Sequence, residues 1–330
     1  MTRRILGLAL LAAMAACSGG GAVPPSDGLR EVTVMLNWTP NNHHAGIYAA
    51  LERGWYAEEG LDVEVVEPAG GGADQVVGAG RAEFGLSQAE SLLPAREQGV
   101  PVVSIATVLP TNDSALMALG GEGIARPRDL VGKTYGGFGG PLETALVRRL
   151  VTCDGGDPDG VTFVEVGDID YLGGLEQDRF DFAWVFNGWD VIAARDVAGA
   201  DIATLPFADQ LDCIPDWYTP IVITNERTAA EDPELVRAFL AATQRGYALA
   251  DADPVAAADL LLAAAAELDE DLVRASAEYH AGRYAADGQA WGAQDAEVWE
   301  RFAAFLDEAG LIEGAVEVDD AYTDAFLPQP

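Results

Sequence analysis

Residues 32–66 constrain the fold most, because they read as a strand, a polar turn, a helix and a second strand. Residues 32–36 are apolar and β-branched, and this strand ends before Pro40, which has no N–H group to donate to a sheet. The helix has one apolar face and Gly54 where it would stop, and residues 61–66 alternate apolar with acidic side chains. Such a unit indicates an open α/β sheet, whose ligands bind beyond the carboxyl ends of the strands.

The chain runs the same plan a second time, with strands expected at 134–138 and 161–166. In both copies a glycine-containing turn opens a helix. A phrase of the form Arg-x-(Asp/Glu)-Phe-(Gly/Ala) then leads into a further strand, at 81–85 and at 179–183. The repetition indicates two similar halves.

We therefore predict an α/β protein of two lobes, each with its own sheet, joined by a double crossover that acts as a hinge. The two crossings are expected at 114–119 and 219–224. Lobe 1 would comprise residues 31–113 and 225–330, and lobe 2 residues 114–224. The chain after residue 225 is mostly helical, with helices expected at 233–250, 254–268 and 296–309.

The first 17 residues have the pattern of a secretory signal. A basic pair at 3–4 precedes an apolar run at 5–13, and small residues lead to Cys17, as in a bacterial lipobox. We expect Cys17 to be lipidated, with an ordinary cleaved signal peptide as the alternative. Residues 18–30, rich in Gly, Pro and Ser, would form a flexible tether. The protein would then be anchored by lipid on the extracytoplasmic face of the cell membrane.

The charge and the remaining cysteines limit the partners. The formal net charge is -35, and Lys133 is the single lysine, which argues against binding to nucleic acid or to anionic surfaces. We expect a monomer. Cys153 and Cys213 are the two remaining cysteines, and an oxidising compartment would allow them to form a disulfide. Two free buried thiols are equally compatible with the sequence.

The opening stretch follows the pattern LNWTPNxxHxGxYxAxxxGWYxxEGLDVEV. This pattern closely resembles the thiamine-pyrimidine-precursor binding proteins of bacterial ABC importers. Their superfamily also holds the yeast hydroxymethylpyrimidine phosphate synthase and the sulfonate and nitrate binding proteins. Further likeness at 284–289, 291–292, 310–312 and 325–327 extends the resemblance to residue 328. The resemblance implies a type II-like periplasmic binding protein, a small heteroaromatic ligand in the interlobe cleft, an ABC permease as partner, and no cofactor.

Candidate ligand residues in lobe 1 follow the predicted strand ends. Trp38 could stack on a flat ring, with core packing as the alternative, and Asn37 would offer an amide beside that ring. His44 matches the histidine of the motif, and we leave open whether it is structural or contacts ligand. Further polar candidates at helix starts and crossings are Ser87, Glu90 and Tyr218.

Candidates in lobe 2 lie in the segment after the strand at 182–185. The resemblance implies an aromatic and a carboxylate here, which by position are Phe186 and Asp190, with Trp189 between them. The family usually has Tyr and Glu at these two positions. A carboxylate suits an aminopyrimidine, because the protonated ring nitrogen and the neighbouring amino group present two parallel donors. Asp190 could alternatively be a helix N-terminal charge. The turn at Gly139 with Glu143 could bind carbonyl or anionic groups through backbone amides or hydrogen bonds.

Three rival functions follow from the same resemblance. The synthase needs a lysine and a histidine four residues later, but this chain has Ser87 and Ser91 at those positions. The synthase also has a cysteine cluster, and the matching stretch of this chain has one cysteine, Cys213. We therefore expect no enzyme. A sulfonate or nitrate binder needs a basic group aimed at the anion, whereas the predicted cleft carries aromatic side chains and Asp190. Riboflavin also stacks on Trp, so a riboflavin-binding function stays open. The paired histidines at 43–44 lack the spacing of a metal site, so no metal is predicted.

Overall fold

The computed structural model describes residues 28–68, 72–167, 169–286, 288–313 and 318–328. The predicted signal sequence with Cys17, residues 18–27 of the predicted tether and most of the glycine run at 70–72 lie outside the described residues. Within the described ranges, the helices are all too short or too polar to cross a membrane.

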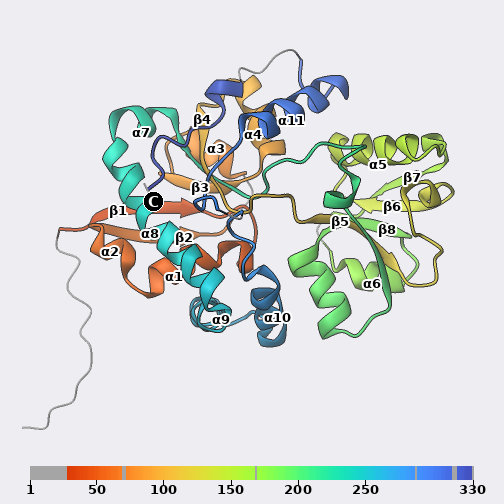
Figure 1. The fold of residues 1–330 in the computed structure, drawn as a ribbon, viewed down its shortest axis with the longest axis horizontal. Helices are drawn as coiled ribbons and strands as arrows, with labels where there is room; N and C mark the ends of the chain where they lie inside the picture. Colours follow the sequence, from red (N-terminus) through yellow and green to blue (C-terminus); the bar gives the residue numbers. More distant parts are fainter. Residues whose placement is uncertain (1–27, 69–71, 168, 287, 314–317, 329–330) are drawn as a thin grey trace, which may run out of the picture.

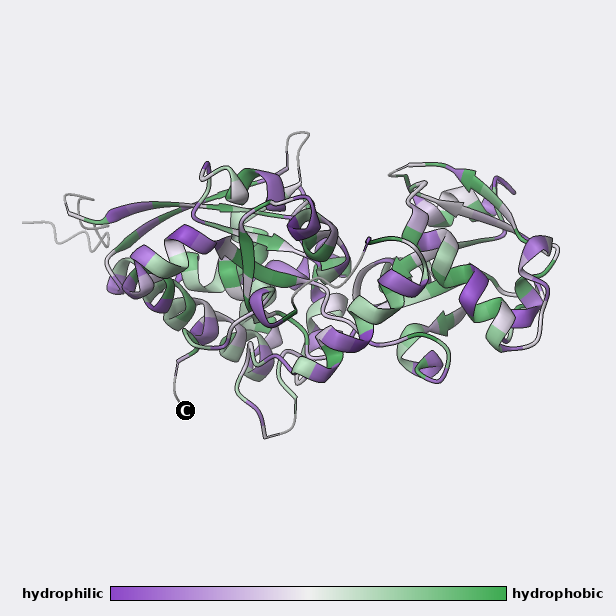
Figure 2. Cartoon of the chain, turned by 90° about the horizontal axis from the view of Figure 1, so that it is seen from above, coloured by the Kyte–Doolittle hydropathy of each residue, from purple (hydrophilic) through white to green (hydrophobic). Residues whose placement is uncertain are grey.

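Two α/β lobes lie side by side, and each contains one five-stranded sheet (Figures 1 and 2). This arrangement confirms the predicted fold class. Sheet A of lobe 1 has the order β2-β1-β3-β10-β4. Its strands, in chain order, are β1 (Arg30–Met35), β2 (Leu61–Val66), β3 (Phe84–Ser87), β4 (Val102–Thr107) and β10 (Ile221–Asn225). The three strands β1, β2 and β3 are parallel, and β10 runs antiparallel to both of its neighbours.

The helices of lobe 1 come from both ends of the chain. The N-terminal part supplies α1 (Ala45–Glu52), α2 (Trp55–Glu58), α3 (Ala73–Gly78) and α4 (Ala89–Glu97). The C-terminal part supplies α7 (Glu226–Glu231), α8 (Pro233–Ala252), α9 (Pro254–Ala264), α10 (Glu270–His280) and α11 (Ala296–Glu308). Gly54 has a φ of 71° directly after α1, as expected of a residue that ends a helix.

Sheet B of lobe 2 has the order β7-β6-β8-β5-β9. Its strands are β5 (Ser114–Leu119), β6 (Thr134–Gly137), β7 (Thr162–Glu165), β8 (Phe182–Phe186) and β9 (Ile202–Pro206). Two helices, α5 (Pro141–Cys153) and α6 (Tyr171–Glu176), and the π-helical turn η4 (Asn187–Val191) accompany them. A disulfide joins Cys153 at the end of α5 to Cys213.

The two crossings are strands of the sheets themselves. β5 lies between β8 and β9, and β10 lies between β3 and β4. Residues 221–225 therefore belong to lobe 1. The boundary predicted after residue 224 has to move to before residue 221, because the apolar return segment completes sheet A.

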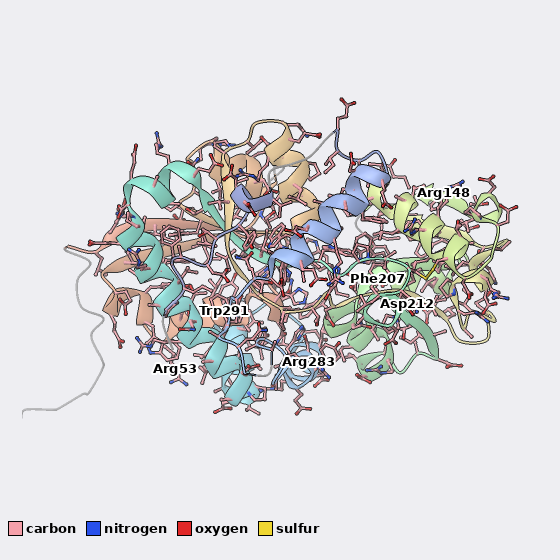
Figure 3. The ribbon with its side chains drawn as sticks, turned by 45° about the horizontal axis from the view of Figure 1, so that its top comes forward. Arg53, Arg148, Phe207, Asp212, Arg283 and Trp291 are labelled. Atoms are coloured by element: carbon pink, nitrogen blue, oxygen red, sulfur yellow. A yellow bond between two sulfur atoms is a disulfide. The ribbon has the colours of Figure 1, made fainter. Side chains whose placement is uncertain are left out.

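Each lobe has its own core, and a further aromatic cluster joins them. In lobe 1, Phe84 stacks on Phe239 with 3.9 Å between ring centroids. At the junction, Trp217 stacks on Phe302 of α11 at 4.9 Å and meets Trp184 of β8 edge-on at 5.9 Å. Figure 3 labels Phe207, a member of this junction cluster, and Trp291, which packs within lobe 1. Apolar contacts thus continue from one lobe into the other.

Candidate interlobe site

The carboxyl ends of the parallel strands in the two sheets face one another across the junction. β4 ends at Thr107, and the chain enters β5 at Ser114, which pairs with Phe186 at the carboxyl end of β8. On the return, Ile221 pairs with Ser87 at the carboxyl end of β3. The connections at residues 108–113 and 207–220 therefore join these two edges, where an open α/β sheet presents its ligands.

The candidate residues lie at these edges, as their places after predicted strands required. Those of lobe 1 lie at or after the carboxyl ends of β1 and β3 and are Asn37, Trp38, His44, Ser87 and Glu90. Those of lobe 2 lie at or after the carboxyl ends of β6 and β8 and are Gly139, Glu143, Phe186, Trp189 and Asp190. Trp38 and Phe186 are both half-buried, in the loop after β1 and at the end of β8.

His44 organises the turn after β1 from within lobe 1. Its ring is fully buried, its Nε2 lies 2.8 Å from Asn37 Oδ1, and its Nδ1 accepts a hydrogen bond from the Asn41 backbone N–H. Burial lowers the pKa of His44 to about 3, with a smaller contribution from His43, so the ring is neutral. Both nitrogens are used in holding the turn and Asn37, which gives His44 a structural role.

Ser87 and Glu90 belong to an acidic group at the start of α4, in which Ser87 and Asp74 are buried and Glu90 is partly exposed. The Ser87 hydroxyl lies 2.8 and 2.9 Å from the two carboxylate oxygens of Asp74, and Glu90 Oε2 accepts a 2.9 Å hydrogen bond from Trp217 Nε1. Burial raises the pKa of Asp74 to about 6. Burial, together with the nearby Asp74 charge, raises the pKa of Glu90 to about 8. Glu90 is therefore mostly protonated at neutral pH.

Glu90→Gln is expected to flatten the dependence of stability on pH between 4.5 and 8. The unfolded carboxyl, with its ordinary pKa of 4.5, loses its proton before the folded one, so raising the pH across this window favours unfolding. One pKa unit corresponds to about 1.4 kcal/mol, and water still reaches this partly exposed group, so we expect a difference of about 1–2 kcal/mol. Urea unfolding at several pH values measures it.

The matched control for this experiment is Glu300→Gln, which removes an exposed carboxyl from α11. It should keep the wild-type decline in unfolding free energy between pH 5 and pH 8. Parallel curves for wild type and Glu90→Gln would show that Glu90 is ionised in the folded protein.

Tyr218 is turned into lobe 1. Its side chain is buried, its hydroxyl accepts a 2.7 Å hydrogen bond from the Asp295 backbone N–H, and its ring lies 5.8 Å from that of Trp299. Its carbonyl also accepts from the Ala89 N–H at the start of α4. The described contacts of Tyr218 thus support the helices that border the junction.

Glu143 occupies the backbone amides of the glycine turn after β6. Its Oε2 accepts from the N–H groups of Gly139 and Gly140 at 2.9 and 3.0 Å. Its Oε1 accepts from the Phe138 N–H and from the Tyr135 hydroxyl, both at 3.0 Å. The chain's own carboxylate therefore fills the position where an anion would bind to these amides.

The turn after β8 reaches from lobe 2 to lobe 1. Asp190 Oδ2 accepts a 2.9 Å hydrogen bond from the Phe186 N–H, which fixes the carboxylate against the Phe186 backbone. The Phe186 ring meets His43 edge-on with centroids 5.5 Å apart, and Trp189 packs against the core of lobe 1. Aromatic residues of lobe 2 thus contact lobe 1 at this point.

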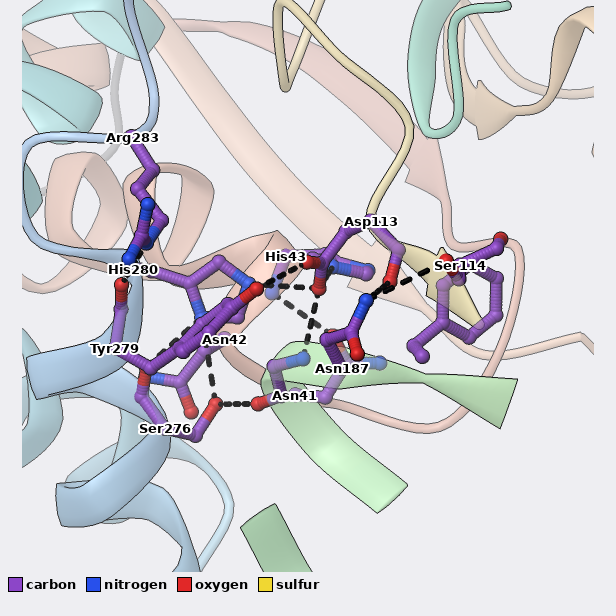
Figure 4. Close-up of polar contacts among 12 residues, drawn as sticks. Asn41, Asn42, His43, Asp113, Ser114, Asn187, Ser276, Tyr279, His280 and Arg283 are labelled. Atoms are coloured by element: carbon purple, nitrogen blue, oxygen red, sulfur yellow. Dashed lines mark hydrogen bonds and ion pairs between the residues drawn. The ribbon is translucent and has the colours of Figure 1, made fainter. Parts of the chain in front are cut away.

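A buried cluster of His43, Asp113 and His280 lies at the same contact (Figure 4). Asp113 Oδ2 accepts a 2.7 Å hydrogen bond from the Gly188 N–H and lies 3.9 and 3.8 Å from Nε2 of His43 and His280. A Cβ atom on Gly188 would lie 2.1 Å from His280 Cε1, so only glycine permits this approach. The sequence pattern predicted no such cluster, because its members come from three distant segments.

Comparison with known proteins places the chain in a family. The sequence profile described as NMT1/THI5 like matches residues 41–257. The formylaminopyrimidine-binding protein of Halalkalibacterium halodurans is 29% identical over 97% of this chain and 98% of its own length. A 4-amino-5-hydroxymethyl-2-methylpyrimidine phosphate synthase of Legionella pneumophila is 27% identical over 90% and 92%. A riboflavin-binding protein of Chloroflexus aurantiacus is 27% identical over 98% and 97%.

Solved structures confirm the fold. The alkanesulfonate-binding protein of Xanthomonas axonopodis pv. citri superposes with a TM-score of 0.67 over 92% of this chain and 99% of its own, at 14% identity. At that identity the likeness establishes the two-lobed binding-protein fold alone. Together with the sequence profile, which covers most of both lobes, it leads to one conclusion: this chain belongs to the NMT1/THI5-like family.

Proposed function

We propose that this protein is the extracytoplasmic substrate-binding subunit of an ABC importer and binds a thiamine pyrimidine precursor between its lobes. The near full-length similarity to a formylaminopyrimidine-binding protein supports this ligand class. Lipidation at Cys17 would hold the protein at the membrane, and a permease with a separate ATPase chain would receive the ligand. The binding protein itself would act as a monomer.

The observation that carries the proposal is the charge of the two facing edges. Asp190 is held beside Phe186 by its bond to the Phe186 N–H, and Asp74 lies at the edge of lobe 1. Glu90 lies beside Asp74 as a mostly protonated, uncharged acid, so the negative charge of the edges comes from Asp190 and Asp74. An anionic ligand would have to displace Glu143 from the glycine turn in order to use those amides. The edges therefore favour a neutral or cationic ring over a sulfonate or nitrate.

An aminopyrimidine meets these groups in a specific way. The flat ring would lie between Trp38 and Phe186, which come from opposite lobes, and its amidine edge would face Asp190. The carboxylate would accept from the protonated ring nitrogen and the amino group together. Binding would draw the lobes onto the ring, and the closed form would be the one that docks on the permease.

The same contacts argue against synthase chemistry. The resemblance implies that the synthase needs a lysine to hold pyridoxal phosphate and a cysteine cluster implicated with iron. The single lysine, Lys133, directly precedes β6 at the amino end of that strand, opposite to the facing edges. Its ammonium group is paired with Glu122 at 2.5 Å. Ser87, at the position of the synthase lysine, donates to Asp74 instead. A binding function needs none of the missing groups.

Calorimetric titration of the protein with four ligands tests the proposal. Formylaminopyrimidine and hydroxymethylpyrimidine are expected to bind at least tenfold more tightly than riboflavin or taurine. Tight binding of riboflavin alone would mean that the protein is a flavin-binding protein. Tight binding of taurine would contradict the inference that the acidic edges disfavour an anionic ligand. Formation of a pyrimidine phosphate on incubation with pyridoxal phosphate and iron would contradict the absence of enzyme activity.

A further inference from the structure

The cluster of His43, Asp113 and His280 has the composition of a metal site. Two imidazoles and one carboxylate each offer one ligand atom, and these three atoms all lie within 4.8 Å of one another. The histidine side chains are 7% and 1% exposed, and that of Asp113 is 10% exposed. Three potential ligands are therefore gathered out of water around one point.

The two histidine nitrogens that face this point have no hydrogen-bond partner among the described residues. Both are Nε2 atoms, and the distances of 3.9 and 3.8 Å to Asp113 Oδ2 are too long for hydrogen bonds. A buried polar atom without a partner costs roughly 1–3 kcal/mol, so two of them at one place need an explanation.

The surroundings orient the cluster as the outer shell of a metal site does. His280 Nδ1 lies 2.8 Å from the Ser276 carbonyl oxygen, so Nδ1 carries the proton and donates it, leaving the Nε2 lone pair directed at Asp113. Asp113 Oδ1 accepts a 2.6 Å hydrogen bond from the Tyr279 hydroxyl, and Oδ2 accepts from the Gly188 N–H. Figure 4 shows these contacts converging on Asp113.

We propose that His43, Asp113 and His280 bind one divalent transition-metal ion, with Zn²⁺ as the best match to two imidazoles and a carboxylate. Ligands of a tetrahedral zinc ion lie roughly 3.3–3.5 Å apart. The two histidine–Asp113 distances of 3.9 and 3.8 Å would therefore shorten by about half an ångström, and the two Nε2 atoms, which lie within 4.8 Å of one another, would approach by at most about 1.5 Å. An open cavity of about 500 Å³, lined in part by Asp113, Tyr279 and His280, would supply access and a water ligand.

The site would belong to this chain rather than to the shared motif. His44 is the histidine of the motif, whereas His43 stands at a position that the motif leaves open. The ion would tie together three segments of lobe 1, namely the turn after β1, the residue before β5 and the end of α10. Asp113 would connect them to lobe 2 through its hydrogen bond from the Gly188 N–H. Its function would be to fix the lobe contact, separately from recognition of the pyrimidine.

Cobalt(II) titration tests this inference independently of ligand binding, because Co²⁺ in a tetrahedral site of nitrogen and oxygen ligands absorbs visible light. The protein is used without a histidine tag and with Cys17→Ser, which removes the thiol outside the disulfide. We expect one Co²⁺ per chain with visible d–d bands, and displacement by one equivalent of Zn²⁺. His43→Asn, His280→Gln and Asp113→Asn should each weaken binding at least 100-fold.

Asp159→Asn is the matched control, because it removes one carboxylate that is 79% exposed and far from the cluster in sequence. It should bind cobalt as the wild type does. Circular dichroism checks that each variant folds, and the milder His43→Asn decides the outcome if Asp113→Asn unfolds. Absence of d–d bands in the wild type, or equal binding by His43→Asn and Asp159→Asn, would overturn the inference and leave a buried histidine–carboxylate cluster only.

Discussion

Replacing Cys153 and Cys213 together by serine is expected to lower the free energy of unfolding by about 4 kcal/mol. The disulfide closes a loop of 60 residues, which includes β7, β8 and β9 of sheet B. Removing the bond returns that loop's conformational freedom to the unfolded chain, and the chain-entropy relation gives this magnitude for a loop of such length. Urea unfolding of the wild type and the double variant, followed by circular dichroism, measures the difference.

Reduction provides an independent control for this prediction. Wild-type protein in excess reductant should unfold at the same urea concentration as the double serine variant, since both lack the bond. The variant itself should be insensitive to reductant. A loss of less than about 1 kcal/mol in the double variant would mean that the unfolded chain is already restricted in this region.

Asp190→Asn is expected to weaken binding of formylaminopyrimidine more than tenfold. The amide offers one acceptor oxygen where the carboxylate offers two, and its NH₂ group would face the donors of the ligand. Loss of a hydrogen bond to a charged group costs about 1.5–3 kcal/mol, and each 1.4 kcal/mol is a factor of ten in the dissociation constant. The oxygen of the introduced amide can still accept from the Phe186 N–H, so the turn after β8 should keep its conformation.

The control for Asp190 is Asp196→Asn, which removes an exposed carboxylate six residues later that pairs with Arg195. Its dissociation constant should match that of the wild type. If Asp190→Asn also binds with unchanged affinity, Asp190 is outside the site and its role is structural. Calorimetry on both variants with the same ligand separates these outcomes.

The parts of the fold that were predictable from the sequence are those with local signals. The unit from β1 to β2, with its polar turn and Gly54, follows from apolar periodicity and helix-stop residues that lie next to one another. In contrast, the segments of β5 and β10 were predicted only as apolar crossings between the lobes, because a short apolar run does not reveal which strands it pairs with in a sheet. β4, β9 and α10 were not predicted.

The candidate site divides in the same way. Residues that follow strands, such as Trp38 and Phe186, were placed at the facing edges because the position of a residue after a strand is a local property. The cluster at Asp113 depends on α10 packing against the turn after β1, which is set by tertiary contacts. Two adjacent histidines illustrate the limit: His44 points into lobe 1 and His43 points to Asp113, and the sequence does not distinguish them.

The position of β10 between β3 and β4 determines when the protein can complete its folding during synthesis. Sheet A receives this strand only after all of lobe 2 has left the ribosome, since residues 114–220 precede it. Lobe 2 is contiguous and can fold as it emerges. Until β10 has been synthesised, lobe 1 lacks the strand that pairs with β3 on one side and with β4 on the other. A nascent chain that stalls before residue 221 would therefore expose two open strand edges to proteases and chaperones.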